Sequence, residues 1–299
     1  MKPAAILLPL LLLLLCCCSP AAADPAGLPE LPDRLPPEYK RVLREGGGTV
    51  ERVEYPSRDY AGDGAEIMKR AVVYLPAGYP ERGKYDLLIL CHGVGGTETE
   101  WGFLKAGSAG KNAVDRLIAG GETPPLIIVM PNGRSCANFA ATGYSNMEPF
   151  YLFGRELRND LLPWIDARYA TFGTREHRWM AGLSMGGMQT VNIGLCECLD
   201  LFSAFGAFSA APTTYPAPRI AEELRKFENC PIRMFYSVCG AQDALAYSAA
   251  SEAAKGLPDC TPLLTEENCV WQECPGTHNF TVWNLALFNF LRIMGSGAV

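Results

Sequence analysis

Short apolar runs and amphipathic stretches alternate along this chain from about residue 70 to its C-terminal end. The runs stop at glycine, proline or histidine, as the run YDLLILC does at His92 and Gly93. Continuous apolar runs of this length are typical of strands buried on both faces, as in a parallel sheet. Such strands are predicted at residues 71–75, 85–91, 126–130, 178–181, 205–208 and 232–239, with a further apolar segment around Val270 and Trp271.

Helical patterns lie between the predicted strands. In residues 155–169, Leu157, Leu161 and Ile165 recur every fourth residue, with charges on the other face. Pro163 is expected to bend this helix or to mark a boundary within it. Further helices are predicted at residues 185–195, 220–227 and 281–294. The alternation predicts an α/β fold, with a mostly parallel sheet, helices on both faces and ligands beyond the carboxyl ends of the strands.

The start of the chain has the pattern of an export signal. Lys2 precedes an apolar stretch at residues 4–18, which small residues follow up to Ala23. This pattern predicts a signal peptide over residues 1–23 and a secreted protein. No integral membrane span is expected, because the apolar stretch is shorter than the roughly 20 residues that a spanning helix needs. The alternative is a lipid anchor at the cell surface, on a cysteine of this stretch.

Two further parts follow the predicted signal peptide. Residues 24–48 are rich in proline and end in three glycines, so a linker or a loosely held N-terminal arm is expected there. Residues 49–295 contain no repeat and no second linker, which predicts a single domain.

Composition limits the function more than it defines it. Hydrophobic residues make up 48% of the chain and charged residues 19%, which is enough apolar material for a full core. The net charge is −6 and no long basic run occurs, which argues against a nucleic-acid partner. Nine of the 12 cysteines follow the predicted signal peptide. In an exported protein some of them are expected to form disulfides, with at least one left over.

A glycine-flanked serine follows one of the predicted strands. The segment Gly182-Leu183-Ser184-Met185-Gly186 is a G-x-S-x-G sequence, preceded by an apolar segment and followed by a helical one. A strand–turn–helix around this sequence is the nucleophile elbow, which exposes the serine hydroxyl above the sheet. Ser184 is therefore the candidate nucleophile, and the Met185 N–H is placed to bind an oxyanion. The alternative is a glycine-rich structural turn.

Chain order selects the base. In elbow-type hydrolases the nucleophile, the acid and the histidine follow one another in that order. Of the three histidines only His278 follows Ser184, so His278 is the candidate general base. His177 lies in a charged stretch and is expected to be solvated. The side chain of His92 is expected to be structural.

The acid must lie between the nucleophile and the histidine. Asp243 follows the predicted strand 232–239 through a short turn, which is where an acid that orients the histidine is needed. Asp200 precedes a strand and is expected at the wrong end of the sheet. Asp259 stands beside Pro258 and is expected in a loop.

The second oxyanion donor is expected after another strand. His92-Gly93-Val94-Gly95-Gly96 is similar to the His-Gly-Gly loop that supplies an oxyanion N–H in hydrolases of this type. The N–H of Val94 is the first candidate and that of Gly93 the second.

Across residues 70–293 the chain resembles the feruloyl and acetyl-xylan esterases of carbohydrate esterase family one, the esterase-D-like branch of the α/β-hydrolases. The resemblance is most specific in AGLSMGG at residues 181–187 and in His278 with Phe280 and Trp283. It implies an α/β-hydrolase fold, a triad of Ser184, Asp243 and His278, and oxyanion donors at Met185 and Val94. It also implies hydrolysis of ester groups on plant cell-wall polysaccharide such as arabinoxylan, often of ferulate. Asn279 departs from the aspartate that often follows the histidine.

Several alternatives stay open at this point. The substrate could be a feruloylated or an acetylated polysaccharide or oligosaccharide, and an acyltransferase would use the same acyl-enzyme. A non-catalytic carbohydrate-binding protein is disfavoured by the intact Ser, Asp and His. Trp101 and Trp283 are candidates for stacking on a phenolic or sugar ring, with core packing as the alternative. No metal or other cofactor is expected, and the oligomeric state is open.

Overall fold

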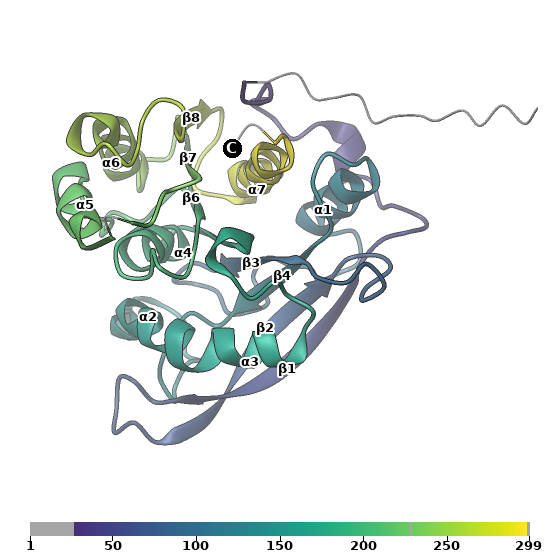
Figure 1. The fold of residues 1–299 in the computed structure, drawn as a ribbon, viewed down its shortest axis with the longest axis horizontal. Coiled ribbons are helices and arrows are strands. Elements are labelled where there is room, and N and C mark those ends of the chain that lie inside the picture. The colour runs from purple at the N-terminus through teal and green to yellow at the C-terminus, as the bar shows by residue number, and fades with distance from the viewer. Residues whose placement is uncertain (1–26, 228, 298–299) are drawn as a thin grey trace, which may run out of the picture.

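The computed structural model describes residues 27–227 and 229–297 and contains one eight-stranded sheet (Figure 1). Its strand order is β1-β2-β4-β3-β5-β6-β7-β8. The strands are β1 (Thr49–Arg58), β2 (Glu66–Leu75), β3 (Asp86–Cys91), β4 (Leu126–Pro131), β5 (Arg178–Leu183), β6 (Ala204–Phe208), β7 (Met234–Gly240) and β8 (Cys269–Cys274).

The sheet is parallel from β4 to β8 and antiparallel at the β1 edge. β1 and β2 form a long hairpin that pairs Thr49 with Leu75 and Arg58 with Glu66, and β2 then pairs antiparallel with β4. All remaining neighbours run parallel. The predicted mostly parallel sheet is therefore confirmed, whereas β1 and the first half of β2 were missed because their residues are largely exposed and polar.

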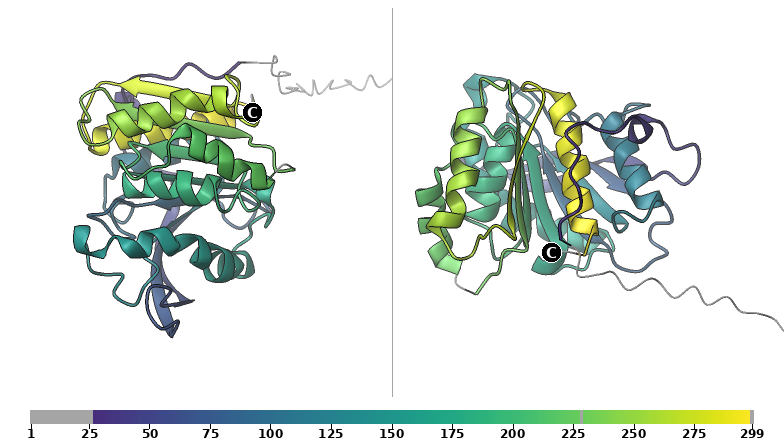
Figure 2. Two further views of the ribbon diagram at one scale, coloured as in Figure 1. Left: turned by 90° about the vertical axis from the view of Figure 1, so that its left-hand side faces the viewer. Right: turned by 90° about the horizontal axis from the view of Figure 1, so that it is seen from above.

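Helices cover both faces of the sheet, as Figure 2 shows from two sides. The α-helices are α1 (Ala109–Ala119), α2 (Phe153–Glu156), α3 (Leu162–Arg168), α4 (Met185–Met188), α5 (Ala217–Leu224), α6 (Tyr247–Cys260) and α7 (Phe280–Gly295). Two π-helical segments, Leu157–Leu161 and Gln189–Leu195, continue α2 and α4. Single 3₁₀ turns occupy Pro37–Lys40, Tyr144–Asn146, Glu148–Leu152, Arg175–His177 and Arg225–Phe227.

Alternate residues of the central strands enter two separate cores. In β3, Leu87, Ile89 and Cys91 join the cluster beneath α2–α6, while Leu88 and Leu90 join the cluster beneath α1 and α7. All strand residues from Leu87 to Cys91 are buried. The continuous apolar run of the sequence thus reflects a strand with a core on each face.

The helix predicted at residues 155–169 exists but is not uniform. It runs as α2, a π-helical segment and α3, and Pro163 stands in the first turn of α3. Pro163 has no N–H to donate to the preceding turn, and it stands where the π-helical segment passes into α3, so it marks a boundary within the helix, one of its two predicted roles. α1 and α6 were not predicted. Asp259 was expected in a loop, but it lies in the last turn of α6.

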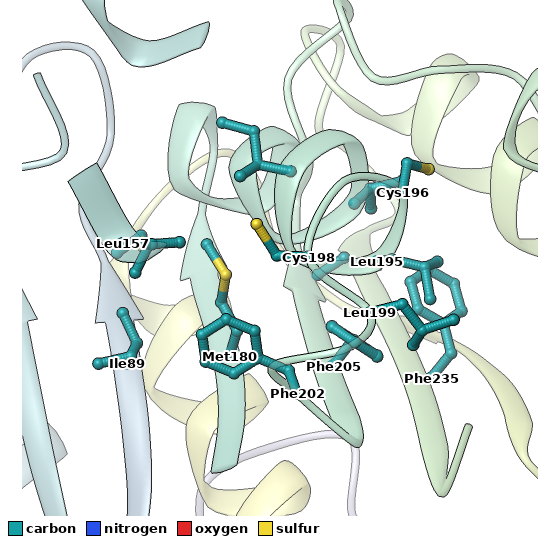
Figure 3. Close-up of a cluster of buried hydrophobic side chains, with 14 of the residues drawn as sticks. Ile89, Leu157, Met180, Leu195, Cys196, Cys198, Leu199, Phe202, Phe205 and Phe235 are labelled. Atoms are coloured by element: carbon teal, nitrogen blue, oxygen red, sulfur yellow. The ribbon is translucent and has the colours of Figure 1, made fainter. Parts of the chain in front are cut away.

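Within the described residues, nine cysteines are free thiols, so the predicted disulfides are not formed in this structure. Cys239 and Cys274 end neighbouring strands, but their side chains enter opposite cores. Cys196 and Cys198 belong to one core, and Figure 3 shows their side chains pointing to different parts of it. Because a disulfide needs Cβ atoms about 4 Å apart, proximity along the chain or the sheet does not suffice.

The N-terminal arm is held on the domain rather than loosely attached to it. Leu35 is buried in the core beneath α1 and α7, with Leu28 and Leu31 packed against the same cluster. The Pro32 carbonyl accepts hydrogen bonds from Gln272 at 2.9 Å and from Asn289 at 3.0 Å. The expectation of a loose linker is therefore wrong for residues 27–48, because these leucines cover apolar surface of the domain.

The predicted signal peptide at residues 1–23 lies outside the described residues. Among the helices of the described part, none is long and apolar enough to cross a membrane.

Candidate active site

Ser184 occupies a strained turn between β5 and α4. Its φ of 52° lies in the left-handed region, where a residue with a side chain is strained, and its N–H is held by the Phe208 carbonyl at 2.9 Å. The flanking glycines are required by close packing. A Cβ added at Gly182 would lie 2.6 Å from the Gly186 carbonyl oxygen, and one added at Gly186 would lie 2.7 Å from the Cys91 backbone. The predicted elbow is thus present as strand, turn and helix.

Three side chains that are far apart in the sequence meet at the carboxyl edge of the sheet. His278 Nε2 lies 3.0 Å from Ser184 Oγ, and His278 Nδ1 lies 2.7 Å from Asp243 Oδ2. Because a carboxylate can only accept, Nδ1 carries the proton and Nε2 is free to accept the serine hydroxyl proton. The arrangement can therefore deprotonate a serine as it attacks.

The Asp243 carboxylate is buried and saturated with donors. Its Oδ1 accepts the N–H groups of Leu245 at 3.1 Å and Ala246 at 3.0 Å. Burial alone would raise the pKa of Asp243, but the hydrogen bonds from His278 and Ala246 outweigh it and lower the pKa. The Cys239 thiol also faces Asp243 Oδ2 at 3.5 Å, and burial together with that charge raises the pKa of Cys239 to about 12. Asp243 is thus an ionised carboxylate that accepts the hydrogen bond from His278 Nδ1.

The predicted oxyanion donors differ in availability. As the first residue of α4, Met185 has an N–H without an acceptor in its own helix. Among residues 27–227 and 229–297 nothing accepts a hydrogen bond from the Val94 N–H. Gly93, the second candidate, is ruled out as a donor because its N–H binds Glu100 Oε2 at 2.7 Å. Gly93 instead allows close approach, since a Cβ there would lie 3.3 Å from Ser184 Cβ.

His92 is a buried structural side chain, as predicted. Its Nε2 accepts the Gly133 N–H at 3.0 Å, so its proton is on Nδ1, which lies 2.7 Å from the Gly93 carbonyl oxygen. Burial, with smaller effects of the charges on Arg134 and Lys69, lowers the pKa of His92 to about 3. His92 is therefore a neutral donor to the loop that carries Val94.

Sequence reasoning missed two side chains beside this loop. The Arg134 guanidinium donates to the Gly96 carbonyl at 2.8 Å and to the Val94 carbonyl, and it lies over the Phe150 ring. Glu100 accepts from Gly93. Glu100 follows β3 and Arg134 follows β4, and these parallel strands end at the same edge of the sheet. Their position after a strand is the sequence feature that could have identified them as candidate site residues.

The two tryptophans that were candidates for substrate stacking are buried. Trp101 is 2% exposed, donates its indole N–H to the Cys91 carbonyl at 3.1 Å and packs against Phe208 and Phe280. Trp283 is 7% exposed and presents an edge-to-face contact to the His278 ring at 5.0 Å. Core packing, the alternative left open for both tryptophans, is therefore correct. The ring of Trp283 also packs against the imidazole of His278.

The other titratable candidates lie away from the triad. Asp200 forms a two-pronged ion pair with Arg158, at 2.6 and 2.7 Å. His177 was expected to be solvated, and its side chain is 41% exposed; it also pairs with Asp86 at 2.6 Å and stacks on Phe172. In the part of the chain that the structure describes, no group of three or more potential metal-binding side chains gathers.

An apolar cluster borders the serine on the side of Val94. It consists of buried Phe150, Met185, Met188 and Ala211, with Val94 and Met147 packed against it and partly exposed. The Ala211 N–H donates to the Ser184 carbonyl at 3.0 Å, which fixes the cluster beside the nucleophile.

Comparisons with known proteins agree with this geometry. The family model described as "Putative esterase" matches residues 67–293. The chain is 30% identical over 229 residues to endo-1,4-beta-xylanase Y of Acetivibrio thermocellus, covering 69% of this chain and 20% of that protein. It is 33% identical over 221 residues to endo-1,4-beta-xylanase/feruloyl esterase of Xylanibacter ruminicola, covering 69% of this chain and 28% of that protein. The chain thus matches less than a third of either relative's length.

A solved structure shares the fold. A mutant of the feruloyl esterase module from Clostridium thermocellum, complexed with sinapinate, is similar at a TM-score of 0.72 and 23% identity, over 91% of this chain and 96% of that one. Since the family match covers most of the chain, the protein belongs to this esterase family, and it shares the α/β-hydrolase fold of the similar structure.

Proposed function

We propose that this esterase removes feruloyl or related hydroxycinnamoyl groups from plant cell-wall polysaccharide, through an acyl-enzyme on Ser184. The observation that carries the proposal is the continuous hydrogen-bonded series from Ser184 through His278 to Asp243, placed beside an apolar cluster. An aromatic acyl group needs apolar surface next to the nucleophile, and the partly exposed Val94 and Met147 offer it.

Catalysis would run in two halves. Ser184 Oγ attacks the ester carbonyl while its proton passes to His278 Nε2, and the carbonyl oxygen becomes an oxyanion held by the N–H groups of Met185 and Val94. The tetrahedral intermediate collapses and its C–O bond to the sugar breaks, while the departing sugar oxygen takes the proton from Nε2 and leaves as a hydroxyl. Water then attacks the acyl-enzyme while His278 Nε2 takes its proton. The bond to Ser184 Oγ breaks, Nε2 returns the proton to Oγ, and the free acid leaves. Asp243 keeps the imidazole in the required tautomer in both halves.

The substrate class rests on the relatives together with the site. One relative carries feruloyl esterase in its name, and the similar solved structure holds sinapinate, a hydroxycinnamate. Both belong to proteins whose names connect them with xylan or with feruloyl esters. These facts support an aromatic acyl group on a xylan-type polysaccharide for this chain.

The proposal is tested by measuring release of free acid from methyl ferulate, feruloylated arabinoxylan oligosaccharide and acetylated xylan. We expect hydroxycinnamate release to dominate and Ser184→Ala to lower kcat by at least about 1,000-fold, because the variant lacks the nucleophile. Ser251→Ala on α6 is the matched control and should behave as the wild type.

Other results would redirect or end the proposal. Release of acetate alone would indicate an acetyl-xylan esterase, and acyl transfer to an added sugar in preference to water would indicate an acyltransferase. If a fluorophosphonate probe failed to label Ser184 and no ester was cleaved, the protein would be a non-catalytic carbohydrate-binding protein.

A further inference from the structure

Glu100 is a partly buried carboxyl group beside the nucleophile that the proposed mechanism does not use. It stands in the loop after β3, and its Oε2 accepts the Gly93 N–H at 2.7 Å. Gly93 in turn lies against Ser184, since a Cβ added there would be 3.3 Å from Ser184 Cβ. The Glu100 carboxyl group is thus hydrogen-bonded to Gly93, a loop residue that lies against the nucleophile.

The loop is built around the Glu100 side chain. A Cβ added at Gly96 would lie 2.2 Å from Glu100 Oε2 and 2.8 Å from its Cβ, so a glycine at this position makes room for the carboxyl group. The next residue, Trp101, is anchored by its hydrogen bond to the Cys91 carbonyl at 3.1 Å. Glu100 therefore has little freedom to leave Gly93.

With Glu100 in place, most of the backbone N–H and carbonyl groups next to Val94 are hydrogen-bonded to side chains. The Gly93 N–H binds Glu100, the Gly93 carbonyl lies 2.7 Å from His92 Nδ1, and the Val94 carbonyl accepts from Arg134. The peptide between Gly93 and Val94 is planar, so fixing its carbonyl also fixes the direction of the Val94 N–H. The Val94 N–H has no acceptor among the described residues, so it can bind an oxyanion.

Glu100 also contributes charge to the site. In the described part of the chain, the charged or titratable side chains that act on its carboxyl group are Arg134 and His278, and His278 in turn contacts the Asp243 carboxylate. Burial raises the pKa of Glu100, while the Gly93 hydrogen bond, Arg134 and His278 oppose that rise. An ionised Glu100 favours the imidazolium that forms as Ser184 loses its proton.

We propose that Glu100 is a positioning residue of the esterase, which holds Gly93 so that the Val94 N–H faces the reacting carbonyl and which assists protonation of His278. This inference rests on the proposed acyl-enzyme at Ser184, but not on the identity of the acyl group.

The test compares three variants with the wild type on p-nitrophenyl acetate, which reports Ser184 chemistry without an aromatic acyl group. Glu100→Ala frees the Gly93 N–H, and we expect kcat to fall about tenfold with KM within about twofold. Glu100→Gln keeps an acceptor oxygen, so kcat should stay within about threefold of wild type. Because Gln has no charge, the acid limb of kcat/KM should move to lower pH.

Glu98→Gln is the matched control. Glu98 stands on the same loop and accepts from Asn132 at 3.2 Å without touching Gly93. This variant loses the same charge and should change neither kcat nor the acid limb.

Two results would overturn the inference while leaving the proposed function intact. In the first, the wild type cleaves the ester and the Glu100→Ala variant has the same kcat as the wild type. The other is a Glu100→Ala variant in which kcat, KM and thermal stability all worsen, together with an acid limb in Glu100→Gln that matches Glu98→Gln. A wild type that cleaves no ester would overturn the proposed function and this inference together.

Discussion

At the scale of single residues, the site depends on backbone conformations that side chains normally avoid. Ser184 and Ser209 are the non-glycine residues with positive φ in the described chain, at 52° and 43°, and each follows a strand. Such conformations cost roughly 1–3 kcal/mol and persist only where neighbours enforce them. Here the Ser184 N–H is held by Phe208 and the Ser209 N–H by Val238, at 2.9 and 2.8 Å. The sheet therefore supplies what keeps the nucleophile exposed.

The two loop glycines at 93 and 95 should respond differently to a methyl group. Gly93→Ala would place a Cβ 2.9 Å from Leu183 Cδ1 and 3.3 Å from Ser184 Cβ, whereas nothing lies within 4 Å of a Cβ at Gly95. We expect Gly93→Ala to lower kcat about 10- to 100-fold by displacing the oxyanion loop. Gly95→Ala should remain within about twofold. Steady-state kinetics on one ester decides, and equal activity of the two variants would contradict this account of Gly93.

At the scale of elements, a buried ion pair joins β2 to α2 and to the loop after β4. Lys69 Nζ lies 3.0 Å from Glu156 Oε2 and also donates to the carbonyls of Asn132 and Arg134, and both charged side chains are 0% exposed. The Tyr55 hydroxyl from β1 donates to the other oxygen of Glu156 at 2.5 Å. Burial lowers the pKa of Lys69, which Glu156 opposes. This network fixes the loop whose Gly133 N–H holds His92.

Breaking this pair on one side should be costly. Lys69→Met leaves Glu156 buried without its cation, and we expect the free energy of unfolding to fall by about 3–5 kcal/mol. Replacing both partners, with Lys69→Met and Glu156→Leu, should recover part of that loss. Arg58→Met is the control, since its pair with Glu66 is solvent-exposed and worth about 1 kcal/mol or less. Urea denaturation measures all three, and a Lys69→Met loss no larger than that of Arg58→Met would refute the buried role.

At the scale of the whole molecule, one sheet and its two cores bring the functional loops together. The loops after β3, β5, β7 and β8 carry Val94, Ser184, Asp243 and His278, and all leave the same edge because these strands run parallel. The arm formed by residues 27–48 lies across the core beneath α1 and α7 (Figure 1). Its Leu28, Leu31 and Leu35 thereby cover apolar surface of that core.

The arm should contribute to stability through its buried leucine. Leu35→Asp places a carboxylate at a site that is 6% exposed, and we expect about 3 kcal/mol less unfolding free energy. Val42→Asp puts the same charge on the same arm at a side chain that is 57% exposed, so little change should follow. Thermal or chemical denaturation compares the two. Equal stabilities would mean that the arm is not part of the folded unit.

The fold was predictable to the extent that local pattern reports burial. Residues 85–91 and 126–130 are apolar throughout because each strand has a core on both sides, and the strands found there confirm the prediction. β1 was missed because its side chains are mostly exposed, so its pairing with β2 is a matter of backbone hydrogen bonds that residue types do not encode. α6 was missed although its buried residues Ala250, Ala253, Ala254 and Leu257 have helical spacing, because Gly256 and Pro258 in the same stretch usually interrupt a helix.

What the sequence by itself determined was the alternation of elements, the elbow at Ser184 and the chain order that selects Asp243 and His278. These follow from the local apolar period, from glycine spacing and from the rarity of histidine. Only the tertiary structure decided that Glu100 takes the Gly93 N–H, that Trp101 and Trp283 are buried, and that neighbouring cysteines face opposite cores. The reason is that a hydrogen-bond partner or a burial site is set by segments far apart in the chain, which no local pattern specifies.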